Sequence, residues 1–434
     1  LGGVAVNTGT IPSKALREAI LQVAGRSVAT PSARDFAAAR DALFSNLIRA
    51  CSRVITAEND IVADQFRRNN IEAMHGTAAF EDEQTLTVTH ERGSDRIQAD
   101  HVLIAVGTRP ARPDNVPFDA TNIITSDQIH DLPDAPTSMI VVGGGVIGTE
   151  YASMLQALGV KTTIIEGRDR LLDFVDAELA EALQFHLRQA GATLRLGEKV
   201  TKIRIIEAIE GSRTTDNIMA EAVLESGKTI RADALLYAVG RQGSTDQLNL
   251  QAAGLEADHR GRIPVNEHFQ TSQPHIYAAG DVIGFPALAS TSYEQGRLAA
   301  CHMFGERCDG ISELLPYGIY AIPEISMVGW TESQLTKEGI PYESGVASFK
   351  EIARGQLLGD DIGMLKLLIH QDSHTVLGVH ALGTGATELI HIGQAAIAFK
   401  ATAEYFVDTV FNYPTLAEAY KVAAYNALNK LRGV

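Results

Sequence analysis

The sequence predicts an α/β fold in which strands alternate with helices, followed by a smaller α+β unit at the C-terminal end. The clearest observation is the run Gly143-x-Gly145-x-x-Gly148, which stands between an apolar strand and a helix and is followed by a second strand. This order is typical of a βαβ unit. From about residue 312 the pattern changes to short strands and amphipathic helices. The chain therefore combines at least one parallel βαβ unit with a unit of a different kind.

The first part of the chain is expected to be helical and then to form short strands. Residues 14–70 are rich in alanine and carry apolar residues at three- and four-residue spacing, which indicates helix. The stretch from Gly25 to Pro31 divides this segment into two helices. Three β-like runs follow: Ile71–Met74, Thr85–Thr89 and His101–Ala105. The proline-rich residues 111–137 indicate a connection between two units.

The rest of the chain repeats the alternation of strand and helix up to about residue 304. The later strands and helices are expected, in chain order, at 139–142, 146–158, 161–165, 177–190, 193–206, 218–225, 234–238, 276–279, 291–304, 366–370, 376–381, 385–399, 402–409 and 415–431. The helices among these are 146–158, 177–190, 291–304, 385–399, 402–409 and 415–431, because their apolar residues recur with helical spacing.

Composition and charge narrow the class of protein. The 434 residues are 45% hydrophobic and 21% charged, which suits a soluble globular chain of two to four domains. A net charge of −16 disfavours nucleic acid and anionic membrane surfaces as partners. No apolar run is long enough for a membrane helix, and no segment resembles a signal peptide. We therefore expect a soluble protein with no nucleic-acid or membrane partner.

Cysteine and histidine usage gives two further expectations. Cys51, Cys301 and Cys308 are too few for a disulfide framework in this length, so we expect buried or partly buried thiols and a cytoplasmic location. The 13 histidines show no metal-ligand spacing, so we expect no metal.

The glycine turn predicts a dinucleotide site because its context is complete. Its glycines permit a tight turn and the close approach of a pyrophosphate to a helix N-terminus. Glu166, at the end of the second strand, favours the free 2′-hydroxyl of NAD. Arg168 and Arg170 lie just beyond and either pair with the 2′-phosphate of NADP or are solvated surface charges. The sequence leaves the choice between NAD and NADP open.

Residues 2–14, GGVAVNTGTIPSK, closely resemble the active-site segment of the flavin-dependent pyridine nucleotide–disulfide oxidoreductases. That family carries Gly-Gly-x-Cys, then a second Cys, then x-Pro-Ser-Lys; here Ala5 and Thr10 occupy the two cysteine positions. Residues 412–418 are similar to the family's His-x-Pro-Thr-x-x-Glu, with Tyr413 at the position of the His. Because the dithiol and its base are lost together, we expect no disulfide chemistry.

The resemblance implies two Rossmann-like nucleotide-binding domains and a C-terminal α+β dimerisation domain. We expect an FAD-binding domain at 1–128 and 264–311, an NAD(P)-binding domain at 129–263 and an interface domain at 312–434. In the family a first βαβ unit with its own glycine turn precedes the active-site segment. We therefore expect that the first Rossmann domain is N-terminally truncated here, that the chain is partial, and that it binds FAD poorly on its own.

The resemblance also assigns roles to residues at the expected active centre. The Lys of Pro-Ser-Lys, Lys14, lies beside the flavin N5 and pairs with a Glu after the second glycine turn, here Glu150. At the flavin face Thr10 donates a hydrogen bond but forms no adduct. Tyr413 reaches the flavin of a partner subunit or simply packs.

Three apolar strands end in glycines expected beside cofactors: Gly107, Gly240 and Gly280. In the family the residue that matches Asp281 hydrogen-bonds the ribityl chain of FAD. An N-cap role for Asp281 is the alternative, and the two roles are compatible.

Within the family, residues 9–14 and 411–415 most resemble the soluble pyridine nucleotide transhydrogenases. This implies ping-pong transfer of hydride from NADPH to NAD through FAD in a homodimer or larger homo-oligomer. An NAD(P)H oxidase or a quinone or dye reductase of the same fold is the second interpretation. A truncated, non-catalytic dimeric remnant is the third.

Overall fold

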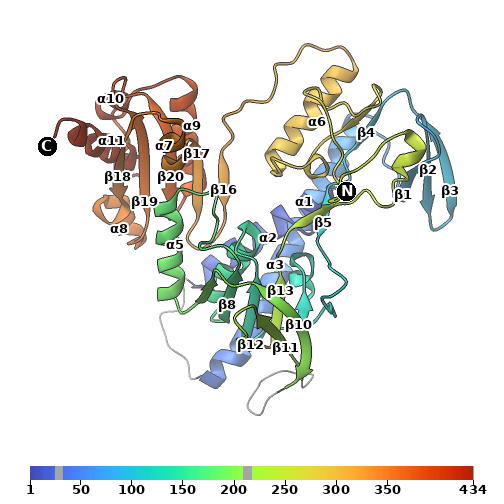
Figure 1. The fold of residues 1–434 in the computed structure, drawn as a ribbon, viewed down its shortest axis with the longest axis horizontal. Helices are drawn as coiled ribbons and strands as arrows, with labels where there is room; N and C mark the ends of the chain where they lie inside the picture. The colour runs from blue at the N-terminus through green and yellow to red at the C-terminus, as the bar shows by residue number, and fades with distance from the viewer. Residues whose placement is uncertain (25–32, 209–217, 434) are drawn as a thin grey trace.

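The computed structural model describes residues 1–24, 33–208 and 218–433, which form three regions with separate sheets (Figure 1). The expected break between Gly25 and Pro31 lies outside the described residues. No helix in these three ranges is both long and apolar enough to cross a membrane. We call the three parts the N-terminal, central and C-terminal regions.

The N-terminal region is built from two separate stretches of the chain, residues 3–110 and 241–303. Strand β4 pairs in parallel with β15, although they are far apart in sequence, and β5 pairs with β14. Its elements are α1 (Gly3–Asn7), α2 (Thr10–Ala24), α3 (Ala33–Arg68), β1 (Thr77–Phe80), β2 (Thr85–His90), β3 (Gly93–Gln98), β4 (Val102–Ile104), β5 (Thr108–Pro110), β14 (Arg241–Gly243), η2 (Leu250–Ala253), β15 (Ile276–Ala278), η3 (Asp281–Ile283) and α6 (Ala289–Met303).

Two expectations for this region are wrong. The expected strand Ile71–Met74 is coil, with Ile71 and Met74 52% and 44% exposed. The strand forms slightly later, as β1, because there it pairs with β2 in the β1–β2–β3 meander. Cys301 and Cys308 form a disulfide rather than two free thiols, because the chain reverses at Gly305 (φ +67°) and returns to α6. Their Cα atoms lie 6.4 Å apart, within disulfide range.

The central region contains the predicted βαβ unit. A parallel five-stranded sheet in the order β6-β13-β7-β8-β9 is accompanied by a three-stranded antiparallel sheet, β10-β11-β12. Ile140 and Val141 of β7 are fully buried, as a strand in a parallel sheet covered on both faces requires. The elements are β6 (Ile123–Ile124), η1 (Ser126–Asp131), β7 (Ser138–Val142), α4 (Val146–Ala157), β8 (Lys161–Glu166), α5 (Ala177–Gln189), β9 (Thr193–Leu196), β10 (Val200–Glu207), β11 (Ile218–Leu224), β12 (Thr229–Ala232) and β13 (Ala234–Tyr237).

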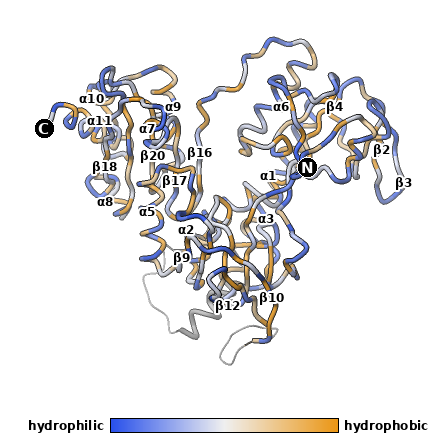
Figure 2. The backbone as a smooth tube through the Cα atoms, in the orientation of Figure 1, coloured by the Kyte–Doolittle hydropathy of each residue, from blue (hydrophilic) through white to orange (hydrophobic). Residues whose placement is uncertain are grey.

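The C-terminal region is built on an antiparallel five-stranded sheet in the order β16-β17-β20-β19-β18. Helices α9 and α11 pack against it, and α5 of the central region contacts β20. In Figure 2 hydrophobic residues follow the strands β17 and β20, whereas the β3 hairpin is hydrophilic. The elements are β16 (Tyr317–Ile319), β17 (Ile325–Gly329), α7 (Glu332–Glu338), β18 (Tyr342–Ser348), η4 (Phe349–Glu351), α8 (Ala353–Leu358), β19 (Met364–His370), β20 (Val376–Leu382), α9 (Ala386–Ala398), α10 (Ala403–Asp408) and α11 (Glu418–Leu431).

Candidate functional site

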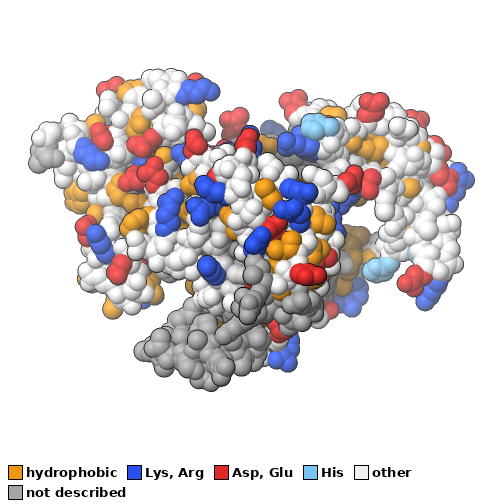
Figure 3. Space-filling model, turned by 60° about the horizontal axis from the view of Figure 1, so that its bottom comes forward, with side chains coloured by type: hydrophobic (Ala, Val, Ile, Leu, Met, Phe, Trp, Pro, Cys, Tyr) orange, Lys and Arg blue, Asp and Glu red, His pale blue; other side chains and the backbone are white. Residues whose placement is uncertain are grey.

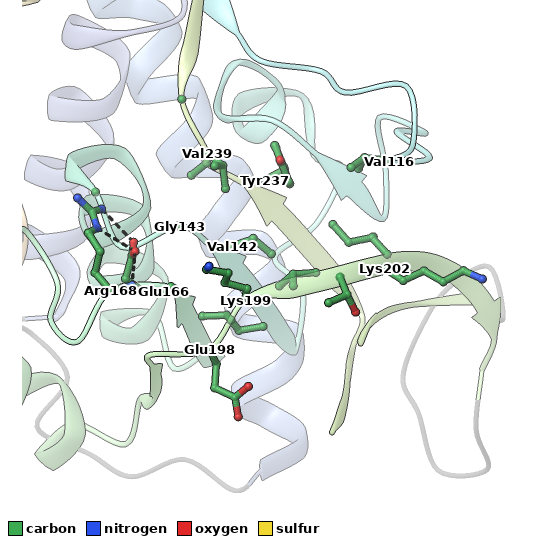
Figure 4. A pocket seen from close by; sticks show the side chains of 18 of the residues that line it. Val116, Val142, Gly143, Glu166, Arg168, Glu198, Lys199, Lys202, Tyr237 and Val239 are labelled. Carbon is green, nitrogen blue, oxygen red and sulfur yellow. Dashed lines mark hydrogen bonds and ion pairs between the residues drawn. The ribbon is translucent and has the colours of Figure 1, made fainter. Parts of the chain in front are cut away.

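A cavity of about 560 Å³ opens where the parallel strands of the central region end (Figure 4). Parallel sheets bind ligands at this edge, because the loops that leave their strands meet there. Five of the residues singled out from the sequence line this cavity: Gly143, Gly145, Glu166, Arg168 and Gly240. The structure therefore brings the predicted glycine turn, the acidic strand end and the second glycine together.

Each glycine of the turn has its own geometric reason. Gly143 has φ +107°, and a Cβ there would lie 2.6 Å from the carbonyl oxygen of Ala238. A Cβ on Gly148 would lie 1.9 Å from the carbonyl oxygen of Gly143, so only glycine lets α4 start this close to the turn. A Cβ on Gly145 would meet no atom within 4 Å, and this open backbone lines the cavity. The turn fits a pyrophosphate held at the N-terminus of α4.

The carboxylate of Glu166 is tied to the turn and to Arg168. Its Oε2 accepts a hydrogen bond from the Gly144 N–H at 2.6 Å, and its Oε1 accepts bonds from the Arg168 N–H and Nε, both at 2.9 Å. Burial alone would raise the pKa of Glu166, but the bonds from Arg168 and Gly144 outweigh it and lower the pKa. Glu166 is therefore ionised at neutral pH and able to accept bonds from ribose hydroxyls.

Two lysines on the far wall of the cavity were missed by the sequence reasoning. Lys199 precedes β10 and Lys202 lies on it; in Figure 4 Lys199 extends toward Glu166, whereas Lys202 points away. These two lysines lie more than 50 residues after the glycine turn and belong to no sequence motif, so their place at the cavity is seen only in the folded structure. In Figure 3 the bottom of the molecule is turned toward the viewer, and several Lys and Arg side chains lie across the middle of this face. Positive charge thus gathers locally on an acidic chain.

Lys14 and Glu150 form the expected pair across 136 residues. The Lys14 Nζ lies 2.9 Å from Oε2 and 3.1 Å from Oε1 of Glu150. The Glu150 side chain is 4% exposed, whereas that of Lys14 keeps 25% exposure. This joins α2 of the N-terminal region to α4, the helix that begins at the glycine turn. The lysine ammonium is thus held by a buried carboxylate, while a quarter of the Lys14 side chain stays exposed.

Ala5 and Thr10, at the two positions where the resembling family carries cysteines, lie near Lys14 on the same segment. Thr10 begins α2 one helical turn before Lys14 and is exposed, and Ala5 lies on α1. Neither side chain offers a thiolate.

Asp281 lies at the end of β15, as its motif predicts. Its Oδ2 accepts a hydrogen bond from the Thr108 hydroxyl at 3.2 Å, and Thr108 directly follows Gly107 (φ +63°). Gly280 has φ +81° and donates its N–H to Gln295 Oε1 at 2.8 Å. A carboxylate at this strand end, held by a hydroxyl, fits an acceptor for the hydroxyls of a bound FAD. The N-cap alternative is not supported, because the Asp281 side chain caps no helix among the described residues.

The structure does not bring Tyr413 to Lys14 within one chain. Tyr413 lies between α10 and α11 of the C-terminal region and is 74% exposed. It borders a shallow hollow with Leu357, which is 68% exposed. Phe399 and Val410 of the same region are 86% and 91% exposed. Tyr413 therefore borders an exposed hollow of the C-terminal region rather than the Lys14 site of its own chain.

Comparison with known proteins covers nearly the whole chain. Residues 1–296 match the family described as pyridine nucleotide-disulphide oxidoreductase, and residues 315–424 match its dimerisation domain. The chain is 51% identical to the soluble pyridine nucleotide transhydrogenase of Mycobacterium bovis, across 100% of this chain and 91% of the relative. It is 46% identical to the protein of the same name from Vibrio atlanticus, across 99% of this chain and 91% of that relative.

Solved structures show the same fold. LpdA from Mycobacterium tuberculosis superposes with a TM-score of 0.85 at 23% identity, covering 98% of this chain and 91% of that one. The HOCl-induced flavoprotein disulfide reductase RclA from Escherichia coli superposes with a TM-score of 0.84 at 24% identity, with 98% and 91% covered. At these identities the similarity speaks for the fold alone.

Proposed function

Because the chain belongs to the pyridine nucleotide–disulphide oxidoreductase family, we propose that it transfers hydride from NADPH to NAD through FAD without a redox disulfide. The observation that carries the proposal is the 51% identity to a soluble pyridine nucleotide transhydrogenase along the entire chain. The lack of a thiol at positions 5 and 10 supports it, because the disulfide chemistry of other family members needs a dithiol there.

The central cavity is the proposed site for both nicotinamide cofactors in turn. Gly145 presents open backbone to the pyrophosphate, and Glu166 accepts bonds from the ribose of NAD. Arg168 already lies against Glu166 and would turn to the 2′-phosphate of NADP. A site with an acidic and a basic partner at the same ribose serves both cofactors, as a ping-pong transfer requires.

Lys14 is the proposed catalytic cation beside the flavin, and Glu150 fixes it. FAD, when bound, would supply the hydride chemistry. Lys14 would stabilise the negative charge that develops as hydride arrives, and Asp281 would hold the ribityl chain. Thr10 would donate a hydrogen bond at the flavin face.

The proposed assembly is a homodimer formed through the C-terminal region. Its match to the family's dimerisation domain and its exposed apolar side chains support this. In such a dimer Tyr413 would reach the flavin site of the partner subunit. We keep 1–128 with 264–311, 129–263 and 312–434 as the proposed division into FAD-binding, NAD(P)-binding and interface domains.

The test removes every cysteine. Full-length, FAD-loaded enzyme carrying Cys51→Ala, Cys301→Ser and Cys308→Ser is expected to keep its rate of hydride transfer from NADPH to thio-NAD. Neither this variant nor the parent should reduce lipoamide or glutathione disulfide. Loss of transfer in the Cys301→Ser/Cys308→Ser variant, with Cys51→Ala alone active, would make the Cys301–Cys308 disulfide part of the reaction and contradict the proposal. Faster reaction with oxygen or a quinone than with thio-NAD would favour a reductase of the same fold.

A further inference from the structure

A short segment of the C-terminal region, residues 320–324, lies against the Lys14–Glu150 pair. The Tyr320 N–H donates to Glu150 Oε1 at 2.8 Å, and the Ile322 N–H donates to Ser153 Oγ at 3.0 Å. The carbonyl oxygen of Ala321 accepts a bond from Arg17 Nε at 3.0 Å. Three consecutive residues are thus bonded to α2 and α4, so all three regions of the molecule meet at Lys14.

The far end of this segment is also anchored. Glu324 accepts a bond from Arg17 Nη2 at 2.9 Å and from the Thr387 hydroxyl at 2.8 Å. Arg17 and Glu324 are buried, with 3% and 8% exposure. A buried ion pair with Arg17 and a second hydrogen bond from Thr387 hold Glu324 firmly, so the position of Tyr320 is set from both sides.

The ring of Tyr320 covers Lys14 with its face. The Lys14 Nζ lies 4.8 Å from the ring centroid, inside the range of a cation–π interaction. Burial raises the pKa of the Tyr320 phenol, so the ring is neutral at physiological pH. One residue therefore contacts both members of the pair, Glu150 through its backbone N–H and Lys14 through its ring.

We propose that Tyr320 is a positioning residue that aims the Lys14 ammonium at the reacting centre. A lysine stem has four rotatable bonds, and fixing it costs rotamer entropy. Glu150 restrains the ammonium on one side only, and the ring of Tyr320 restrains it on a second. Electrostatic stabilisation of a transition state needs such fixed groups, because a group that must first be oriented loses part of its effect. This inference rests on the proposed function, since it takes Lys14 as the catalytic cation.

The test compares Tyr320→Leu with Tyr320→Phe. Both variants keep the backbone N–H to Glu150, but only Phe keeps a ring face over Lys14. In FAD-loaded enzyme mixed with NADPH, Tyr320→Leu is expected to slow flavin reduction about 2- to 30-fold, the range a cation–π contact supports. Tyr320→Phe is expected to recover most of that rate. Equal rates in the Leu and Phe variants would overturn the proposal.

A second measurement needs no cofactor. An amine-reactive acetylating reagent labels Lys14 at a rate that peptide mass spectrometry follows, with exposed Lys337 as internal reference. Tyr320→Leu should label Lys14 several-fold faster than the parent, because the covering ring is gone, and Tyr320→Phe should label it at the parental rate. Unchanged labelling in Tyr320→Leu would overturn the proposal even if that variant loads FAD poorly.

A Lys14→Met variant separates the role of Tyr320 from that of Lys14. If Lys14→Met slows flavin reduction while Tyr320→Leu does not, the role of Tyr320 is wrong and that of Lys14 stands. If Lys14→Met reduces its flavin at the parental rate, the catalytic role of Lys14 is wrong, and the role of Tyr320 falls with it.

Discussion

Two lysines, Lys14 and Lys366, join different regions of the molecule and differ in how completely the protein surrounds them. The Lys366 Nζ lies 2.7 Å from Glu332, 2.9 Å from Glu178 and 3.0 Å from Asp176, and its side chain is 1% exposed. Lys14 has one carboxylate and one ring, and its side chain is 25% exposed. The side chain of Lys366 is thus enclosed, whereas that of Lys14 stays partly exposed.

The difference separates a structural cation, Lys366, from the proposed catalytic one, Lys14. Lys366 of β19 binds the start of α5 and α7, so it fastens the central region to the C-terminal region. Burial alone would lower the pKa of Lys366, but its three carboxylates outweigh this and raise it. All its donors are used, which leaves none for a ligand. Under the proposed function, Lys14 would interact with charge that appears during the reaction.

The largest expected effect is on stability, at the enclosed lysine. Lys366→Met leaves a buried carboxylate without its cation and should lower the free energy of unfolding by about 3–5 kcal/mol. Lys337→Met, on exposed α7 surface, is the control and should change little. Denaturant unfolding measures both. If Lys366→Met were as stable as the control, Lys366 would not be a structural cation, and the contrast drawn with Lys14 would be wrong.

Arg168 is a second partly exposed cation, with its side chain 47% exposed beside the carboxylate of Glu166. Arg168→Gln should weaken NADPH binding by about 1.5–3 kcal/mol, the range of a hydrogen bond to a charged group, and leave NADH binding nearly unchanged. Lys199→Gln should show a smaller loss of the same kind. Lys202→Gln is the matched control, because Lys202 borders the same cavity but points away. Equal losses for NADPH and NADH in Arg168→Gln would argue against a 2′-phosphate contact.

The smallest expected effect is a pH dependence beside Lys366. His380, fully buried, bonds the Trp330 carbonyl oxygen through Nε2 at 2.9 Å, and burial lowers its pKa. The folded state therefore holds His380 neutral, while the unfolded chain takes up a proton below its ordinary pKa of 6.5. Stability should fall as pH drops below that value, by at most about 1.4 kcal/mol per pH unit.

Urea unfolding of the parent, His380→Gln and His391→Gln across pH 5 to 8 measures this dependence. His380→Gln should flatten the acid side of the profile, whereas His391→Gln, at an exposed position of α9, should not. An unchanged slope in His380→Gln would show that another group titrates.

The sequence alone predicted the glycine turn, Glu166 and the Lys14–Glu150 pair, but neither Tyr320 nor the Lys366 cluster. The turn is predictable because strand, glycines and helix follow one another in the sequence. Lys14 and Glu150 are predictable because they match positions of the family motif. Tyr320 lies in a segment without periodicity. It contacts Lys14 of α2 and Glu150 of α4, which lie far earlier in the sequence. The carboxylates around Lys366 come from two regions and have no common spacing. The strand expected at 71–74 failed because a strand needs a pairing partner, which the residues themselves do not reveal.

The measurement that tests the central claim most directly is the stopped-flow rate of flavin reduction by NADPH in FAD-loaded Lys14→Ala enzyme. Loss of one preorganised charged contact should raise the barrier by about 2–4 kcal/mol, by analogy with the removal of an oxyanion-hole donor. Nicotinamide affinity should change far less, because the interaction strengthens only as hydride is transferred. A variant that reduces its flavin at the parental rate and loses only nicotinamide affinity would make Lys14 a binding residue and contradict the account.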